Sequence, residues 1–223
     1  MITKQRLLAG VNEMMKSLFL EYKRKKSKIK DRLAEFNSLW KRSDKTIFRE
    51  LCFCICTPQS KAVLCDESIR KMEKNGILFK GTLRELKAGL KGVRFYNNKA
   101  RYISAARELF TVSGRIRIKD KIDPGDIGAT RFWFQEQVKG IGPKEASHFL
   151  RNIGFGKNLA ILDVHVLKNM VKYGIIKEIP GAMTKKVYLD LEKKLAKFSR
   201  KIKIPMAELD LLFWSHETGQ IFR

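Results

Sequence analysis

The chain has 223 residues, of which 44% are hydrophobic, so it is long enough to fold around a sizeable core as one domain or two small ones. Its 47 lysines and arginines stand against 23 aspartates and glutamates, which gives a net charge of +24 at pH 7. A field of this sign attracts polyanions and favours a nucleic-acid-binding protein, although a ribosome-associated or merely lysine-rich protein stays an alternative. The sequence has no apolar run of about 18 residues and no signal-peptide pattern, so we expect no membrane association and an intracellular location, in the cytoplasm or nucleoid.

Helical periodicity dominates the first half of the chain. Two apolar stripes at helical spacing occupy residues 7–19 and 29–39, and a third at 48–55 ends before Pro58, because proline stops a helix. Further helices are predicted at 60–72, 83–90 and 98–109.

Four cysteines lie in one apolar stretch: Cys52, Cys54, Cys56 and Cys65. Their spacing is not that of a zinc site and no histidine is near them, so we expect buried free thiols in a reducing compartment.

The second half of the chain is also read as helical. Residues 116–122 alternate apolar and charged side chains, but a single strand would have no partner, so this segment is predicted to be a loop. Asp163 is placed to cap the helix that follows it. Helices are predicted at 130–138, 143–152, 164–173, 184–201 and 205–216. The fold class expected from these patterns is all-α.

The most informative motif is a glycine hairpin followed by a lysine and, nineteen residues later, a carboxylate. The hairpin is Val138-Lys139-Gly140-Ile141-Gly142-Pro143-Lys144-Glu145-Ala146, and the acid is Asp163. Gly140 and Gly142 allow positive φ angles and a close approach of the backbone, and Pro143 suits the first turn of a helix. Unpaired amides and the positive end of the helix dipole make such a site fit a DNA phosphate. Glu145 is read as a solvated neighbour of Lys144.

This arrangement resembles the helix-hairpin-helix DNA glycosylase superfamily, most strongly over about residues 130–170, where Gly154-Phe155-Gly156 and Leu162-Asp163-Val164-His165-Val166 also match. The resemblance implies two helical lobes with the hairpin at the cleft between them. We place one lobe at residues 43–160 and the other at 1–42 together with 161–223.

The resemblance also implies the chemistry. Members with a lysine at the position of Lys144 release the base through a Schiff base and then cut the strand by β-elimination, while Asp163 matches the essential acid of the superfamily. An amine attacks only when it is neutral, and an ordinary lysine has a pKa of about 10.4. Partial burial, the helix N-terminus and nearby cations all disfavour the charged form.

Gln59 is similar in position to a DNA-entering amide of the superfamily, and the C-terminus and Phe95 resemble the archaeal-type 8-oxoguanine DNA glycosylase/AP lyases. Trp214 and Phe95 are expected to line the base pocket, with the terminal carboxylate of Arg223 near the base, although that group usually ends in lysine. Gln59 is expected to fill the space that the flipped base leaves, or to touch the orphan partner base. A core position for Trp214 and, for the segment of Gln59, a plain turn around Pro58 are the structural alternatives.

The expected partner is double-stranded DNA that contains oxidised guanine, bound by a monomer. No cofactor and no catalytic metal are expected, apart from a monovalent cation held by the hairpin carbonyls of Gly140 and Gly142. Relatives with an iron–sulfur cluster carry four cysteines near the C-terminus, and this chain has no cysteine after Cys65, so we expect no cluster. A glycosylase of the superfamily for another lesion and a non-enzymatic DNA-binding module are the competing hypotheses.

Overall fold

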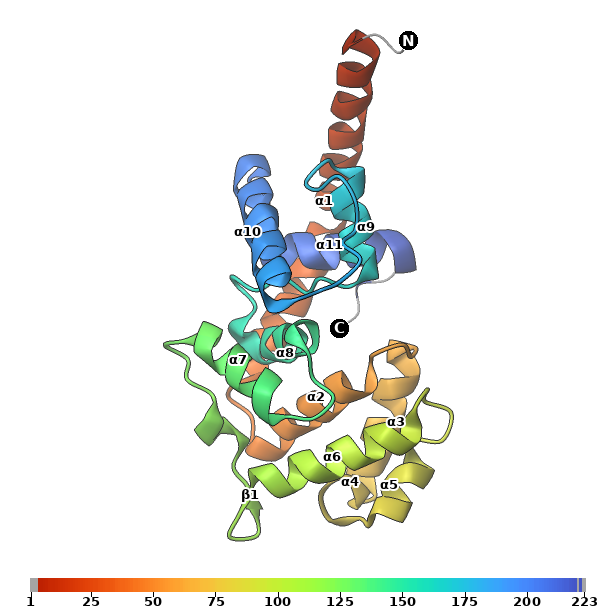
Figure 1. Cartoon of the computed structure of the whole chain (residues 1–223), viewed down its shortest axis with the longest axis vertical. Coiled ribbons are helices and arrows are strands. Elements are labelled where there is room, and N and C mark those ends of the chain that lie inside the picture. Colours follow the sequence, from red (N-terminus) through yellow and green to blue (C-terminus); the bar gives the residue numbers. More distant parts are fainter. Residues whose placement is uncertain (1–3, 220, 222–223) are drawn as a thin grey trace. The chain divides into compact units, whose positions relative to one another are not determined.

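Helices account for almost all regular structure in the computed structural model of the chain (Figure 1). The structure describes residues 4–219 and 221, and it describes side chains in 13–216, 219 and 221. The α-helical fold class expected from the periodicity is confirmed. The chain divides into two compact units.

The first unit comprises the described parts of Met1–Glu35 and Lys157–Phe222. It contains most of α1 (Lys4–Leu39), followed by α9 (Val164–Lys172), α10 (Lys185–Ile202) and α11 (Met206–Thr218). Tyr173 stacks on Phe213 with ring centroids 5.4 Å apart, and both Phe213 and Tyr188 are buried. The two N-terminal stripes of the sequence belong to one helix, because residues 20–28 contain neither proline nor glycine and consist mainly of good helix formers.

The second unit, residues 36–156, is built around α2 (Asp44–Cys56). Every side chain of α2 from Phe48 to Cys56 is buried except that of Arg49, as expected for a helix at the centre of a core. The surrounding elements are α3 (Ala62–Lys74), α4 (Ile77–Lys80), α5 (Leu83–Gly89), α6 (Tyr96–Phe110), β1 (Thr111–Val112), β2 (Arg115–Ile116), the 3-10 helix η1 (Ile118–Lys121), α7 (Ile127–Gln137), α8 (Pro143–Leu150) and the π-helix η2 (Arg151–Phe155).

The segment predicted as a loop at 116–122 is partly regular, and that prediction is corrected. Ile116 pairs with Thr111 in a two-residue antiparallel ladder, and η1 follows. Ser113 and Gly114, between the strands, have φ angles of 49° and 73°, which is the backbone of a tight hairpin turn. The strand therefore has the partner that the sequence prediction did not find.

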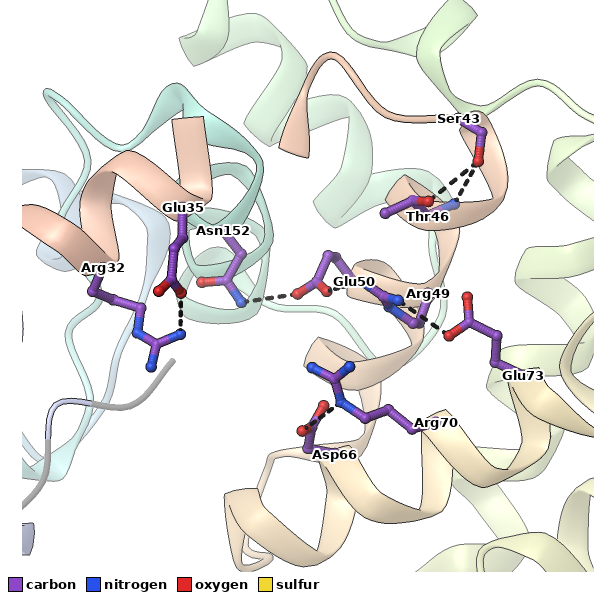
Figure 2. Close-up of polar contacts among 10 residues, drawn as sticks. All are labelled: Arg32, Glu35, Ser43, Thr46, Arg49, Glu50, Asp66, Arg70, Glu73 and Asn152. Atoms are coloured by element: carbon purple, nitrogen blue, oxygen red, sulfur yellow. Dashed lines mark hydrogen bonds and ion pairs between the residues drawn. The ribbon is translucent and has the colours of Figure 1, made fainter. Parts of the chain in front are cut away.

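A buried carboxylate and the arginine beside it join three elements of the second unit (Figure 2). Glu50 of α2 is fully buried; its Oε1 lies 3.3 Å from Arg49 Nη2 and its Oε2 accepts a 3.5 Å hydrogen bond from Asn152 of η2. Arg49 also reaches Glu73 of α3 at 3.1 Å. A buried charge must be paired, so Glu50 ties the end of the α8–η2 segment to α2.

The breaks between the units lie at 35/36 and 156/157, a few residues before the expected boundaries. Within the described residues, no helix is long and apolar enough to cross a membrane.

Candidate active site

The glycine hairpin joins α7 to α8 within the second unit (Figure 1). Gly140 has φ +82°, and a Cβ on it would collide with the Tyr102 ring of α6, so both the backbone and the space require glycine. Gly142 has φ −98° and is the N-cap of α8, so the positive φ expected there is not found. The hairpin is thus fixed against α6 through one glycine rather than two.

Lys144 lies in the first turn of α8, as the motif predicts, with 27% of its side chain exposed. Its Nζ lies 2.9 Å from Glu145 Oε1, and Glu145 Oε2 accepts a 3.2 Å hydrogen bond from the Gly142 N–H. The prediction that Glu145 is solvated is therefore wrong, because its side chain is only 12% exposed and bridges the hairpin backbone to the lysine. This is half of a capping box, in which an acid at the third helical position reaches back to the N-cap amide.

The surroundings of Lys144 carry further positive charge. Burial lowers the pKa of His148 well below its ordinary value, and the charges of Arg151 and Lys144 act in the same direction. Burial likewise lowers the pKa of Lys99. The cations Lys144 and Arg94 lower this pKa further, and the nearby cysteines act in the opposite direction. His148 is therefore a neutral core residue, and Lys144 lies close enough to Lys99 for their charges to interact.

Asp163 belongs to the first unit, where it caps α9 as expected. Its Oδ1 accepts a 2.8 Å hydrogen bond from the Val166 N–H, and the residue is partly exposed. The segment that leads to it is anchored on α10: Glu192 Oε2 accepts the Ala160 N–H at 2.8 Å, and Tyr188 donates to the Ala160 carbonyl at 2.5 Å. The backbone that leads to Asp163 is therefore held in place by α10.

Gln59 and Phe95 lie in the second unit, on two loops that are joined by a hydrogen bond to the side chain of Ser60. Gln59 is exposed with φ +53°, and Phe95 is 51% exposed with φ +59°. The Arg94 N–H donates to Ser60 Oγ at 3.2 Å, which joins the two loops beside these residues. The structure therefore brings Gln59 and Phe95 to neighbouring loops, whose positive φ angles the sequence analysis did not foresee.

Trp214 lies on α11 of the first unit and is partly exposed between the buried Phe213 and Ser215. The helix is held to α1 by polar contacts: His216 Nε2 lies 2.7 Å from Glu21 Oε2, and Lys25 donates to Ser215 Oγ at 3.0 Å. Arg223, the other predicted residue of the base pocket, lies outside the described residues.

The four cysteines are free and buried, as predicted. Among the described residues no group of three or more His, Cys, Asp or Glu side chains could hold a metal ion. The cation at the hairpin carbonyls stays a prediction. The Gly142 carbonyl accepts the Ala146 N–H at 3.0 Å.

Three comparisons with known proteins agree with one another. A family model described as 8-oxoguanine DNA glycosylase matches residues 29–204. The chain is 42% identical to an 8-oxoguanine DNA glycosylase/AP lyase of Fusobacterium nucleatum, over 95% of this chain and 99% of that one. It is 38% identical to a protein of the same description from Korarchaeum cryptofilum, over 96% and 97%.

Solved structures of similar proteins share the fold. The Methanocaldococcus jannaschii 8-oxoguanine glycosylase/lyase, in complex with a 15mer DNA containing 8-oxoguanine, is 31% identical with a TM-score of 0.85, covering 95% of this chain and 100% of that one. The 8-oxoguanine DNA glycosylase of Thermotoga maritima is 32% identical with a TM-score of 0.83, covering 96% and 100%.

Proposed function

Because the chain belongs to the 8-oxoguanine DNA glycosylase family, we propose that it excises 8-oxoguanine from double-stranded DNA and then cuts the strand at the abasic site. The observation that carries the proposal is Lys144, an amine in the first turn of the helix that follows the hairpin. A DNA-binding module needs the hairpin and the positive charge. It does not need a partly buried amine at this position or a carboxylate like Asp163.

Lys144 is the proposed nucleophile. The neutral amine attacks C1′ of the damaged nucleoside as the glycosidic bond breaks, and the base leaves with the bonding electrons and takes up a proton. Opening of the sugar gives a Schiff base between Nζ and C1′. Loss of a proton from C2′ then expels the 3′ phosphate by β-elimination, and water hydrolyses the imine to restore the lysine. The free protein pairs Lys144 with Glu145, so attack requires this pair to open.

Asp163 is the proposed electrostatic partner in the reaction. Its carboxylate, acting on the same nucleotide as Lys144, would stabilise the positive charge that develops on the sugar as the base leaves, and would assist proton transfer at the amine. Its capping hydrogen bond to Val166 uses Oδ1 and fixes the side chain. A carboxylate that is already oriented needs no reorganisation when the charge forms.

The remaining predicted residues serve DNA recognition in this proposal. The hairpin at Gly140 and Gly142 binds a phosphate, and the net charge of +24 draws the enzyme to DNA. Phe95 and Trp214 hold the flipped base by stacking, which is worth about 1–3 kcal/mol for each base. Gln59 occupies the space that the base leaves.

The test is borohydride trapping on a duplex that contains one 8-oxoguanine. The unmodified chain should form a covalent adduct with the DNA, because borohydride reduces the Schiff base, and Lys144→Gln should lower trapping and strand cleavage by a factor of about 10³ or more. Binding to the same duplex should persist, because the hairpin and its charge remain. Lys74→Gln, which changes an exposed lysine of α3, is the matched control and should trap like the unmodified chain.

Two results would contradict the proposal. Trapping that survives Lys144→Gln would place the nucleophile elsewhere. Excision of an oxidised pyrimidine or a mismatched base in preference to 8-oxoguanine, on a panel of otherwise identical duplexes, would assign the enzyme a different lesion.

A further inference from the structure

Lys99 of α6 is a lysine almost without solvent contact, with 4% of its surface exposed. Its Nζ donates to the carbonyls of Cys56 and Pro58 at 2.6 and 2.8 Å and to Ser60 Oγ at 2.9 Å. An ammonium group has three protons to donate, so all of them are used. The carbonyls lie at and just beyond the C-terminal end of α2, where the helix dipole favours a cation.

Ser60 receives a second hydrogen bond, from the other loop. The Arg94 N–H donates to the same Oγ at 3.2 Å, so one hydroxyl joins the turn after α2 to the turn before α6. Ser60 follows Gln59 directly, and Arg94 precedes Phe95 directly. The hydrogen bond between Ser60 and Arg94 therefore joins the neighbours in sequence of the two exposed residues predicted to contact DNA.

Both of those residues have a left-handed backbone, which costs a residue with a side chain about 1–3 kcal/mol and persists only where the surroundings impose it. The φ angles are 53° at Gln59 and 59° at Phe95. The guanidinium of Arg94 lies 4.9 Å from the centre of the Phe95 ring and covers one of its faces. The hydrogen bonds of Lys99 and Ser60 link the turn that carries Gln59 to the turn that carries Phe95.

We infer that Lys99 and Ser60 are positioning residues for lesion recognition: they hold the Gln59 and Phe95 loops together, so that Phe95 meets the flipped base while Gln59 occupies the space that the base leaves. The inference rests on the proposed function, because it gives the two loops a role on DNA. It goes beyond that function by assigning the buried lysine and the serine, whose side chains bond to the protein's own loops, a part in selecting the damaged base.

The decisive variant is Ser60→Ala, because it removes the shared acceptor and leaves both carbonyl contacts of Lys99 in place. Single-turnover excision of 8-oxoguanine at saturating enzyme should fall about tenfold, the change that corresponds to about 1.4 kcal/mol. Ser60→Thr keeps a hydroxyl and should retain most of the excision rate. Lys99→Met, which removes the Lys99 hydrogen bonds to the Cys56 and Pro58 carbonyls and to the Ser60 hydroxyl, should cause a larger loss if it folds.

A double-mutant cycle separates positioning from general stability. In a chain that already carries Gln59→Ala and Phe95→Ala, the change Ser60→Ala should have no further effect on excision, because there is nothing left for it to position. Thr82→Ala removes the N-cap of α5 in the same unit and is the control for destabilisation; it should lower the melting temperature without lowering excision.

Equal losses from Ser60→Ala in the two backgrounds would overturn the inference and leave the proposed function intact. An excision rate unchanged by Ser60→Ala in the otherwise unmodified chain would also overturn it. Failure of the unmodified chain to excise 8-oxoguanine at all would overturn the proposed function, and the inference with it.

Discussion

At Asp163 one carboxylate is assigned two roles that are separable in principle. Its hydrogen bond to the Val166 N–H caps α9 and is a structural contact. The proposed stabilisation of the sugar cation needs a negative charge, which capping does not. Asparagine caps a helix about as well as aspartate but is neutral, so it distinguishes the two roles.

We therefore expect Asp163→Asn to leave the free energy of unfolding within about 0.5 kcal/mol of its original value while excision falls by about 10²-fold or more. Asp163→Ala should lose both roles, with a further cost in stability of about 1 kcal/mol. Denaturant unfolding and single-turnover excision measure the two effects. An active Asp163→Asn enzyme would reduce this residue to a helix cap.

The sequence was sufficient to place Lys144 in the first turn after the hairpin and Asp163 at a helix start, because the spacing of glycine, proline and capping residues is a local signal. It was insufficient for Glu145. The sequence predicts that Glu145 is a solvated neighbour of Lys144. An acid three residues after Gly142 is, however, the pattern of half a capping box. The left-handed backbone at Gln59 and Phe95 was not foreseen either. The contacts of Ser60 with Arg94 and Lys99 join two turns that are far apart in the chain, so no local pattern reveals them.

At the scale of elements, the α7–α8 hairpin depends on Gly140 and on its contact with α6. A side chain at Gly140 would both strain the backbone and collide with Tyr102. Gly76, in the same unit, has a similar φ of +73°, but a Cβ added there would meet nothing within 4 Å. Substituting alanine at Gly76 therefore tests backbone strain alone, whereas substituting it at Gly140 tests strain together with displacement of the hairpin.

Gly76→Ala should cost about 1–2 kcal/mol in stability from the left-handed backbone alone and leave DNA affinity unchanged. Gly140→Ala should cost more and should also raise the Kd for duplex DNA about tenfold, since the hairpin must move away from Tyr102 and its phosphate contacts weaken. Thermal unfolding and fluorescence anisotropy on the two variants provide the comparison. Equal Kd values would exclude the hairpin from DNA binding.

Most helices were predictable because their apolar periodicity is long and their ends carry capping residues, as at Thr184. Shorter elements were not. The four-residue α4 offers too few turns for a periodic signal, and the π-helix η2 arises where Gly154, with φ +98°, lies against the backbone of Asn37. The β1–β2 hairpin was missed although Ser113-Gly114 is a turn dipeptide, because two-residue strands show no alternation.

At the scale of the whole molecule, the charge of +24 makes a prediction about salt. If the protein contacts about six phosphates, its affinity for undamaged duplex should fall by about 10³ between roughly 50 and 200 mM salt, because bound DNA releases its counterions. The single-turnover excision rate at saturating enzyme should change far less, since the chemistry follows binding. A shallow dependence of Kd on salt would mean that most of the positive surface does not meet DNA.

The resemblance implied lobes at residues 43–160 and at 1–42 with 161–223, whereas the two compact units of the structure divide the chain at 35/36, inside α1, and at 156/157. An uninterrupted helix of 36 residues gives the sequence no turn or proline to mark a boundary. Such a boundary is set by which core each half of the helix packs into, and that is a property of the folded chain.

The burial of the four cysteine thiols also has a practical consequence. All are buried, and burial raises the pKa of Cys65 to about 11, so at neutral pH they will compete poorly for a maleimide dye. Donor and acceptor fluorophores can therefore be attached to one introduced cysteine on each unit without removing the native ones. Energy transfer between the dyes would then follow, molecule by molecule, how the protein responds to a lesion.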